Sequence, residues 1–580
     1  MLEPRRLPTT IDRADPVPDN FGANLYRSDP DFDALLPLYL PADLINHLRP
    51  HLDRLGALAG GRLDELAAVA DRNPPTLSHR TRSGKDLQRV LKHPAYVELE
   101  RTAYADYGLA AVSHRADVLG WPEPMPAAAK YALTYLFVQA EFGLCCPVSM
   151  TDSLTRTLRR FGDPKLVARH LPALTSLDFD GLAQGAMFMT EQGAGSDVGA
   201  VATRAWQDAE GQWRLEGDKW FCSNPDADLA MVLARPDGAP QGTRGLTLFL
   251  LPRLLEDGTP NHYRILRLKD KLGTRSMASG EIRLEGALAW PVGDPGRGFV
   301  HMTDMINNSR LSNGVRAAGL MRRATTEALF IARNRRAFGR ALIEMPLMQR
   351  QLAKMMVWTE QARSVVFQAA DALRRADAGD EEGRLLLRIL TPLLKFRACR
   401  DARKVTGDAM EVRGGCGYIE EWSDARLLRD AHLGSIWEGT GNIVALDVMR
   451  SIRKEGTLAA LDRHLAIQLN AAALPSTLRS GFDAAWQRAR ALAEATAAQA
   501  DEGRARQAAS ALYHLVAAAS MAWESRLAPA AGRRLLLAQL VLRHRVLPSD
   551  PLAISGAEDE WLPGLLSEEP MAADAVPRLL

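Results

Sequence analysis

The sequence predicts a mostly helical α+β protein: an N-terminal helical domain, a middle antiparallel β-barrel or sandwich, a helical bundle and an extra C-terminal helical domain. Apolar residues recur at helical spacing over most of the chain, but from about residue 183 to 291 they form short runs broken by turn residues. At 580 residues, the chain is too long for one hydrophobic core. With 47% hydrophobic and 24% charged residues, it is too apolar for wholesale disorder.

The first two segments differ in proline content. Residues 1–45 should form an extended arm, because proline lacks the N–H donor that a helix needs. The segment holds seven prolines: Pro4, Pro8, Pro16, Pro18, Pro30, Pro37 and Pro41. Residues 46–182 carry a helical apolar pattern, which predicts an all-α domain.

The next three segments complete the layout. In residues 183–291 the expected strands lie too close together for crossover helices, which favours antiparallel pairing. Residues 292–452 should form a helical bundle, with one long stripe of buried positions from Met348 to Leu373. Residues 453–580 should form a helical extension that ends in an acidic tail.

Charge and cysteine content exclude several classes of protein. The net charge of +2 gives the whole chain no field that would attract a polyanion, so any nucleic-acid contact must be local. The cysteines show no C-x-x-C spacing, which indicates neither a disulfide framework nor a metal site and favours a cytoplasmic location. No apolar window is long enough to span a membrane. The five cysteines are Cys145, Cys146, Cys222, Cys399 and Cys416.

A glycine-containing segment, MTEQGAGSD at 189–197, lies where the helical pattern gives way to the strand pattern. Glycines at 193 and 195 allow main-chain N–H groups to approach a flat or anionic ligand closely. Taken alone, the segment is more typical of a glycine-containing hairpin loop with no ligand.

Four further motifs follow this segment in order: GDKWFCSN at 217–224, RRAFG at 335–339, RGGCGY at 413–418 and GSIWEGTGN at 434–442. Together, the five motifs resemble those of the acyl-CoA dehydrogenase flavoproteins over about residues 90–452. The runs NPPTLSH, KDKLGTRSMAS and PLMQRQLAKM, together with the arm and the extension, are similar to the AidB-type, alkylation-response branch.

The resemblance implies FAD as cofactor and assigns residues to it. Thr190 would meet the flavin ring, Ser196 the pyrophosphate, and Phe221 and Ser223 would lie beside the isoalloxazine. Arg335 and Phe338 would meet the FAD of a neighbouring subunit, which implies a homotetramer. The full predicted cofactor set is Met189, Thr190, Gly195, Ser196, Phe221, Cys222, Ser223, Arg335, Phe338, Gly414, Gly415, Ile436, Trp437, Gly439, Thr440, Gly441 and Asn442. Glu411 stands where the family has Gln, which would rearrange the contact between subunits.

Glu438 in I-W-E-G-T matches the family's carboxylate base, which removes the α-proton of an acyl thioester. Such a base must be partly desolvated, because the α-proton is weakly acidic. The alternative is a carboxylate that only favours the N-terminus of the following helix. Arg450, on that helix, would weaken the base if its guanidinium folded back onto the carboxylate.

The C-terminal extension is the candidate for DNA contact. Residues 451–550 hold thirteen basic and eight acidic side chains. Arg533, Arg534, Arg543 and Arg545 could form a patch that binds duplex phosphates without sequence preference. A solvated helical surface explains the same charges.

Three functions follow from these observations. The first is an FAD-dependent acyl-CoA dehydrogenase that acts on an acyl-CoA or a related small molecule. The second is an AidB-like, DNA-associated flavoprotein of the response to DNA alkylation, with weak or vestigial dehydrogenase activity. The third is an oligomeric scaffold in which FAD is structural.

Overall fold

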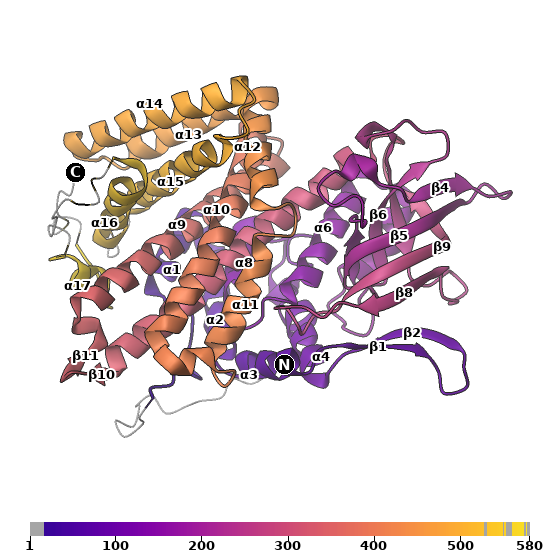
Figure 1. The fold of residues 1–580 in the computed structure, drawn as a ribbon, viewed down its shortest axis with the longest axis horizontal. Helices are drawn as coiled ribbons and strands as arrows, with labels where there is room; N and C mark the ends of the chain where they lie inside the picture. The colour runs from indigo at the N-terminus through magenta and orange to yellow at the C-terminus, as the bar shows by residue number, and fades with distance from the viewer. Residues whose placement is uncertain are drawn as a thin grey trace. The chain divides into compact units, whose positions relative to one another are not determined.

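A computed structural model describes residues 17–526, 531–548, 550, 552, 559–572 and 576. It confirms the predicted fold class, since helical segments precede and follow a β region (Figure 1). The start of the predicted arm, residues 1–16, lies outside the described residues, as do Glu558 and Asp574 of the acidic tail. Throughout the described part of the chain, no helix is both long enough and apolar enough to cross a membrane.

The chain divides into two compact units, and each is described by itself. Unit 1 contains Leu63–Met125 and Ala140–Ser309. Unit 2 contains the described residues up to Arg62, Pro126–Gln139, and those from Arg310 onward. Helix α8 (Gly298–Asn334) therefore begins in unit 1 and continues into unit 2.

The helices of unit 1 have clear start and stop signals. At the start of α7, the Asp163 side chain accepts a hydrogen bond from Lys165 N at 2.8 Å, and Pro164 occupies the first turn, where no N–H partner is required. Gly162 ends the helix before it. The helices are α4 (Pro94–Arg101), α6 (Cys145–Phe161) and α7 (Pro164–Leu174), and α3 (Arg62–Arg72) leads into the unit.

The sheet of unit 1 is closed, because the path β3-β6-β4-β5-β9-β7 returns to β6 through an added β6–β7 pairing. The antiparallel prediction is wrong for two pairs: β6 runs parallel to both β3 and β4. The intervening strands provide the crossover that a parallel pair needs. The strands are β3 (Gly185–Phe188), β4 (Arg204–Gln207), β5 (Trp213–Ser223), β6 (Leu229–Pro236), β7 (Thr247–Pro252), β8 (Tyr263–Leu268) and β9 (Ser279–Pro291).

The prediction that residues 46–182 are all helical is wrong at one place. Strands β1 (Thr76–Arg80) and β2 (Asp86–Leu91) form an antiparallel hairpin, visible in Figure 1, that contacts β8. Its turn requires Gly84, which has a φ of 85°. Leu77 and Val90 pack against the hydrophobic core of the sheet. This burial stabilises a hairpin that its short, polar strands would not form alone.

Unit 2 contains the long helices of the bundle. The predicted stripe lies on α9 and is buried from Leu352 to Leu373, which confirms the bundle core. All the residues of α5 are buried, and α5 contacts both α2 and α9. The helices are α1 (Pro30–Leu35), α2 (Ala42–Gly60), α5 (Ala127–Phe137), α9 (Pro346–Asp377), α10 (Glu381–Arg413), α11 (Ser423–Gly434) and α12 (Gly441–Glu455).

The C-terminal extension belongs to the same unit. Helix α15 is rich in alanine and packs against α9, α10 and α12, so the extension shares a core with the bundle (Figure 1). Small side chains permit this close approach of helices. Its helices are α13 (Thr457–Ala471), α14 (Ser476–Ala498), α15 (Ala505–Glu524), α16 (Ala531–Val541) and α17 (Leu562–Leu565).

Candidate active site

The first two cofactor motifs meet in unit 1. The backbone N–H of Trp220 on β5 donates a hydrogen bond of 2.8 Å to the carbonyl oxygen of Thr190 in the loop after β3. The segments MTEQGAGSD and GDKWFCSN therefore lie side by side, although about thirty residues separate them in the sequence.

A buried ion pair anchors this loop. Lys219 Nζ on β5 lies 2.7 Å from Glu191 Oε1, and the Lys219 side chain is fully buried. Glu191 also accepts hydrogen bonds from the backbone N–H groups of Ala202 at 2.7 Å and Thr203 at 3.1 Å. Burial alone would raise the pKa of Glu191, but the Lys219 charge and these donors hold it below its usual range. We did not predict this pair, although both residues stand inside the recognised motifs.

Alternation along β5 decides which side chains face outward. Phe221 is 57% exposed, whereas the Cys222 side chain lies in the hydrophobic core, so Cys222 can reach a cofactor only through its backbone. Gly193 and Gly195 have open space where a Cβ would lie, and Ser196 is exposed. An exposed aromatic ring beside open glycine backbone and hydroxyl donors fits a flat, anionic cofactor such as FAD.

Cations cover the neighbouring aromatic side chains. Lys269 Nζ lies 3.5 Å from the centroid of the Trp220 ring and 4.9 Å from that of Phe221. The Lys269 ammonium also forms an ion pair with the Glu281 carboxylate. A positive charge therefore lies over the ring of Phe221 as well as over that of Trp220.

The I-W-E-G-T segment lies in unit 2, between α11 and α12. Glu438 has a φ of 56° and Gly439 a φ of 97°, so two consecutive residues adopt left-handed backbone conformations. The Arg310 side chain donates from Nε to the Glu438 carbonyl oxygen at 2.9 Å, and Lys395 Nζ donates to the Gly439 carbonyl oxygen. No local sequence signal marked Arg310 or Lys395, because each is a single basic residue within a helical pattern.

Asp447 supports this arrangement from α12. It lies 2.7 Å from Arg310 Nη1 and 2.8 Å from Arg388 Nη2. The predicted modulator Arg450 is 58% exposed, and its ion pair is with Asp447 at 3.8 Å. Arg450 thus meets the alternative of a solvated arginine and not the condition under which it would weaken Glu438, whereas Arg310 contacts the Glu438 backbone.

The residues around Glu438 differ in exposure. Ile436, Thr440 and Asn442 are exposed, and Gly441 is half-buried at the first position of α12. The guanidinium of the buried Arg316 lies 4.7 Å from the centroid of the Trp437 ring.

The two remaining motifs meet near the end of α8. Arg335 Nη1 donates to the Arg413 carbonyl oxygen at 2.7 Å, next to Gly414 and the exposed Gly415. Phe338 is 97% exposed, between the two strands of the short hairpin β10 (Arg336–Ala337) and β11 (Arg340–Ala341).

Glu411, the departure from the family's Gln, contacts a neighbouring helix. Its Oε2 accepts a hydrogen bond from Gln351 Nε2 of α9 at 3.0 Å.

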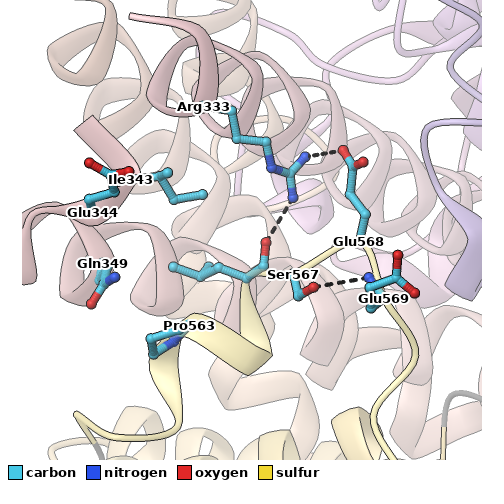
Figure 2. A pocket seen from close by; sticks show the side chains of 9 residues that line it. Arg333, Ile343, Glu344, Gln349, Pro563, Ser567, Glu568 and Glu569 are labelled. Carbon is cyan, nitrogen blue, oxygen red and sulfur yellow. Dashed lines mark hydrogen bonds and ion pairs between the residues drawn. The ribbon is translucent and has the colours of Figure 1, made fainter. Parts of the chain in front are cut away.

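A cavity of about 470 Å³ lies beside Arg333, in the last turn of α8. None of the predicted site residues lines it. In Figure 2, the side chain of Arg333 bridges to the C-terminal segment: it lies 2.6 Å from Glu568 Oε1 and donates to the Leu566 carbonyl oxygen at 2.7 Å. The cavity is lined by Arg333, Ile343, Glu344, Gln349, Pro563, Leu566, Ser567, Glu568 and Glu569. Part of the acidic tail is thus bound to the bundle.

The predicted DNA-binding patch does not form on the surface, because Arg533 and Arg534 are buried. Arg534 is fully buried and pairs with Glu360 and Glu524, and Arg533 lies 3.0 Å from Asp31 of α1. These two arginines join the extension to the bundle and to the N-terminal segment, because buried carboxylates need a counter-charge. Of the other two, Arg545 lies over the Trp358 ring at 4.8 Å, and Arg543 is half-buried.

Comparisons with known proteins agree with these features. Three family profiles match: "Adaptive response protein AidB N-terminal domain" at residues 16–181, "Acyl-CoA dehydrogenase, middle domain" at 186–287 and "Acyl-CoA dehydrogenase, C-terminal domain" at 296–453. Acyl-CoA dehydrogenase family member 11 of Caenorhabditis elegans is 34% identical over 76% of this chain and 73% of its own length. The putative acyl-CoA dehydrogenase AidB of Escherichia coli is 36% identical over 67% of this chain and 71% of its own. The structure of C. elegans ACDH-11 in complex with C11-CoA superposes with a TM-score of 0.85 at 29% identity, covering 93% of each chain.

Proposed function

We propose that Glu438 is the catalytic base of this chain, which belongs to the acyl-CoA dehydrogenase family and is an FAD-dependent oxidoreductase. The observation that supports this role is the conformation of the segment that carries the residue. A glutamate with a φ of 56° is followed by a glycine with a φ of 97°, and two cationic side chains bind their carbonyl oxygens. A carboxylate that only favoured a helix N-terminus would require no such arrangement.

In the proposed mechanism, the Glu438 carboxylate removes the α-proton of the acyl thioester. FAD, when bound, supplies the acceptor for the β-hydrogen, which leaves as hydride. Glu438 is half-buried, which fits the partial desolvation that an effective base for a weak carbon acid requires. The backbone N–H of Glu438 is proposed to stabilise the negative charge on the thioester oxygen.

The cofactor contacts are proposed for both units. In unit 1, Thr190, Ser196 and Ser223 provide hydroxyl groups, and Phe221 provides an exposed aromatic face. In unit 2, Arg335 would meet the FAD of a second copy of the chain.

The proposed substrate is an acyl-CoA thioester. The C. elegans relative binds C11-CoA in its solved structure, and we extend that ligand class to this chain. A panel of thioesters that differ in acyl chain length measures the preference of the site.

We also propose a homotetramer and a cytoplasmic location. Exposed apolar side chains at the end of unit 2 that carries Arg335 support the oligomer; they are Phe338, Leu347, Tyr418 and Ile419. The five free thiols support a reducing compartment. We do not extend the proposal to DNA, because Arg533 and Arg534 are buried in ion pairs.

The decisive variant is Glu438→Gln, which keeps the shape of the side chain and removes its basicity. The FAD-loaded wild type should lose its oxidised-flavin absorbance when mixed with its acyl-CoA substrate, and Glu438→Gln should retain FAD but bleach at least a thousandfold more slowly. The matched control is Glu494→Gln on α14, whose partner is the surface residue Arg490 at 2.8 Å. Wild-type-like bleaching in Glu438→Gln would assign the base to another residue.

A further inference from the structure

We propose that Arg310 and Lys395 are positioning residues for Glu438, and that they act by binding the carbonyl oxygens of Glu438 and Gly439. The kinetic part of this inference rests on the proposed function, because it takes Glu438 as the base. Neither residue belongs to a recognised motif.

The backbone of this segment needs external support. A glutamate in the left-handed region persists only where its surroundings hold it there. The two supports come from different helices: Arg310 lies on α8 and Lys395 on α10. They bind consecutive carbonyl groups, so the peptide planes on both sides of Gly439 have fixed orientations. The backbone that follows the Glu438 Cα is thereby held in one conformation.

Arg310 is itself held in place. Its Nη1 lies 2.7 Å from Asp447 Oδ2 on α12, and Arg388 binds the same carboxylate. A Cβ at Gly439 would lie 3.3 Å from Arg310 Nη2, so the close approach of Arg310 favours glycine at this position. The glycine of I-W-E-G-T is therefore explained by the guanidinium as well as by its positive φ.

Lys395 adds a titratable charge next to the base. It is almost fully buried, and burial lowers its pKa to about 8, with the positive charge of Arg310 acting in the same direction. The Cys399 thiol of its own helix and the carboxylate of Glu438 act in the opposite direction. Lys395 is thus mostly protonated at pH 7 and loses its proton through about pH 8. The loss removes a positive charge that acts on Glu438, and a carboxylate is a stronger base without a cation beside it.

Three variants test the two supports and the titration of Lys395. Lys395→Met removes both in a side chain of similar length, whereas Lys395→Arg keeps both but stays protonated above pH 8. Arg310→Gln tests the second support independently. Lys404→Met is the control, because Lys404 lies on the same helix, its side chain is 58% exposed and it pairs with Asp408.

The first measurement does not depend on activity. Amide hydrogen exchange of the FAD-loaded protein, followed by mass spectrometry over residues 436–441, should be at least tenfold faster in Lys395→Met and in Arg310→Gln. It should be unchanged in Lys404→Met. Unchanged exchange in both test variants would overturn the positioning role, whether or not the protein is a dehydrogenase.

The second measurement is the rate of flavin bleaching by acyl-CoA in a stopped-flow instrument. Lys395→Met should lower the limiting rate at least tenfold and leave the apparent acyl-CoA dissociation constant within threefold. In the wild type, the limiting rate should rise through about pH 8, and Lys395→Arg should lack this rise. Wild-type rates and pH profiles in both Lys395 variants would overturn the inference. A wild type that no acyl-CoA bleaches would refute the proposed function instead, and hydrogen exchange would still decide whether the two residues hold the segment.

Discussion

The ion pair between Glu191 and Lys219 gives the sharpest test of how unit 1 is held together. Lys219→Met would leave the Glu191 carboxylate in place without its cation, 2.7 Å from where the ammonium had been. Breaking a buried pair by removing one partner costs about 3–5 kcal/mol. Glu191 would keep three donors, the N–H groups of Ala202 and Thr203 and the Thr203 hydroxyl, so we expect a loss near the lower limit, about 3 kcal/mol.

The assay is urea unfolding of the FAD-loaded protein, followed by circular dichroism and flavin fluorescence. The double variant Glu191→Gln/Lys219→Met, which leaves no buried charge at the pair, should lose less than Lys219→Met alone. FAD should also dissociate more readily from Lys219→Met, because the pair anchors the Thr190 loop. A loss below about 1 kcal/mol in Lys219→Met, or a double-variant loss equal to the sum of the two single-variant losses, would refute this reasoning.

The pair also has a defined pH dependence. The pKa of Glu191 lies below its ordinary value of 4.5, so the folded protein holds the carboxylate ionised. Its contribution to the free energy of unfolding is fully present above pH 4.5 and is lost as the pH falls through the folded-state pKa. The difference in stability between the wild type and Lys219→Met should therefore shrink below about pH 4.

Two further predictions concern the I-W-E-G-T segment that carries Glu438. Gly439→Ala places a Cβ at a φ of 97° and 3.3 Å from Arg310 Nη2, so it should lower the free energy of unfolding by about 1–3 kcal/mol and slow flavin bleaching by acyl-CoA. Urea unfolding and stopped-flow absorbance measure these effects, and a variant as stable and as fast as the wild type would contradict them. Arg450→Met should change the bleaching rate less than threefold, because the Arg450 side chain is 58% exposed and pairs with Asp447. A tenfold change would show that Arg450 does modulate the base.

Local patterns in the sequence were sufficient for the fold class and for the order of the candidate motifs. Helical spacing along α9 marked the positions from Leu352 to Leu373 that the structure buries. Short apolar runs marked the β region, because strand and helix have different periods. The hairpin β1–β2 was not predicted, because the apolar pattern of its two strands is weak. The strands are stabilised instead by the core of the sheet, which Leu77 and Val90 contact.

The tertiary structure alone decided how charged side chains are used. From the sequence, Arg533 and Arg534 were expected to form part of a surface patch. The fold instead places acidic partners around them, including Asp31, which is 502 residues away from Arg533. The Arg310 side chain reaches the Glu438 backbone across 128 residues. A charged side chain in a sequence carries no sign of whether water or a distant partner will surround it. That is determined when helices pack, because a buried charge is tolerated only where another element supplies its counter-charge or its hydrogen bonds.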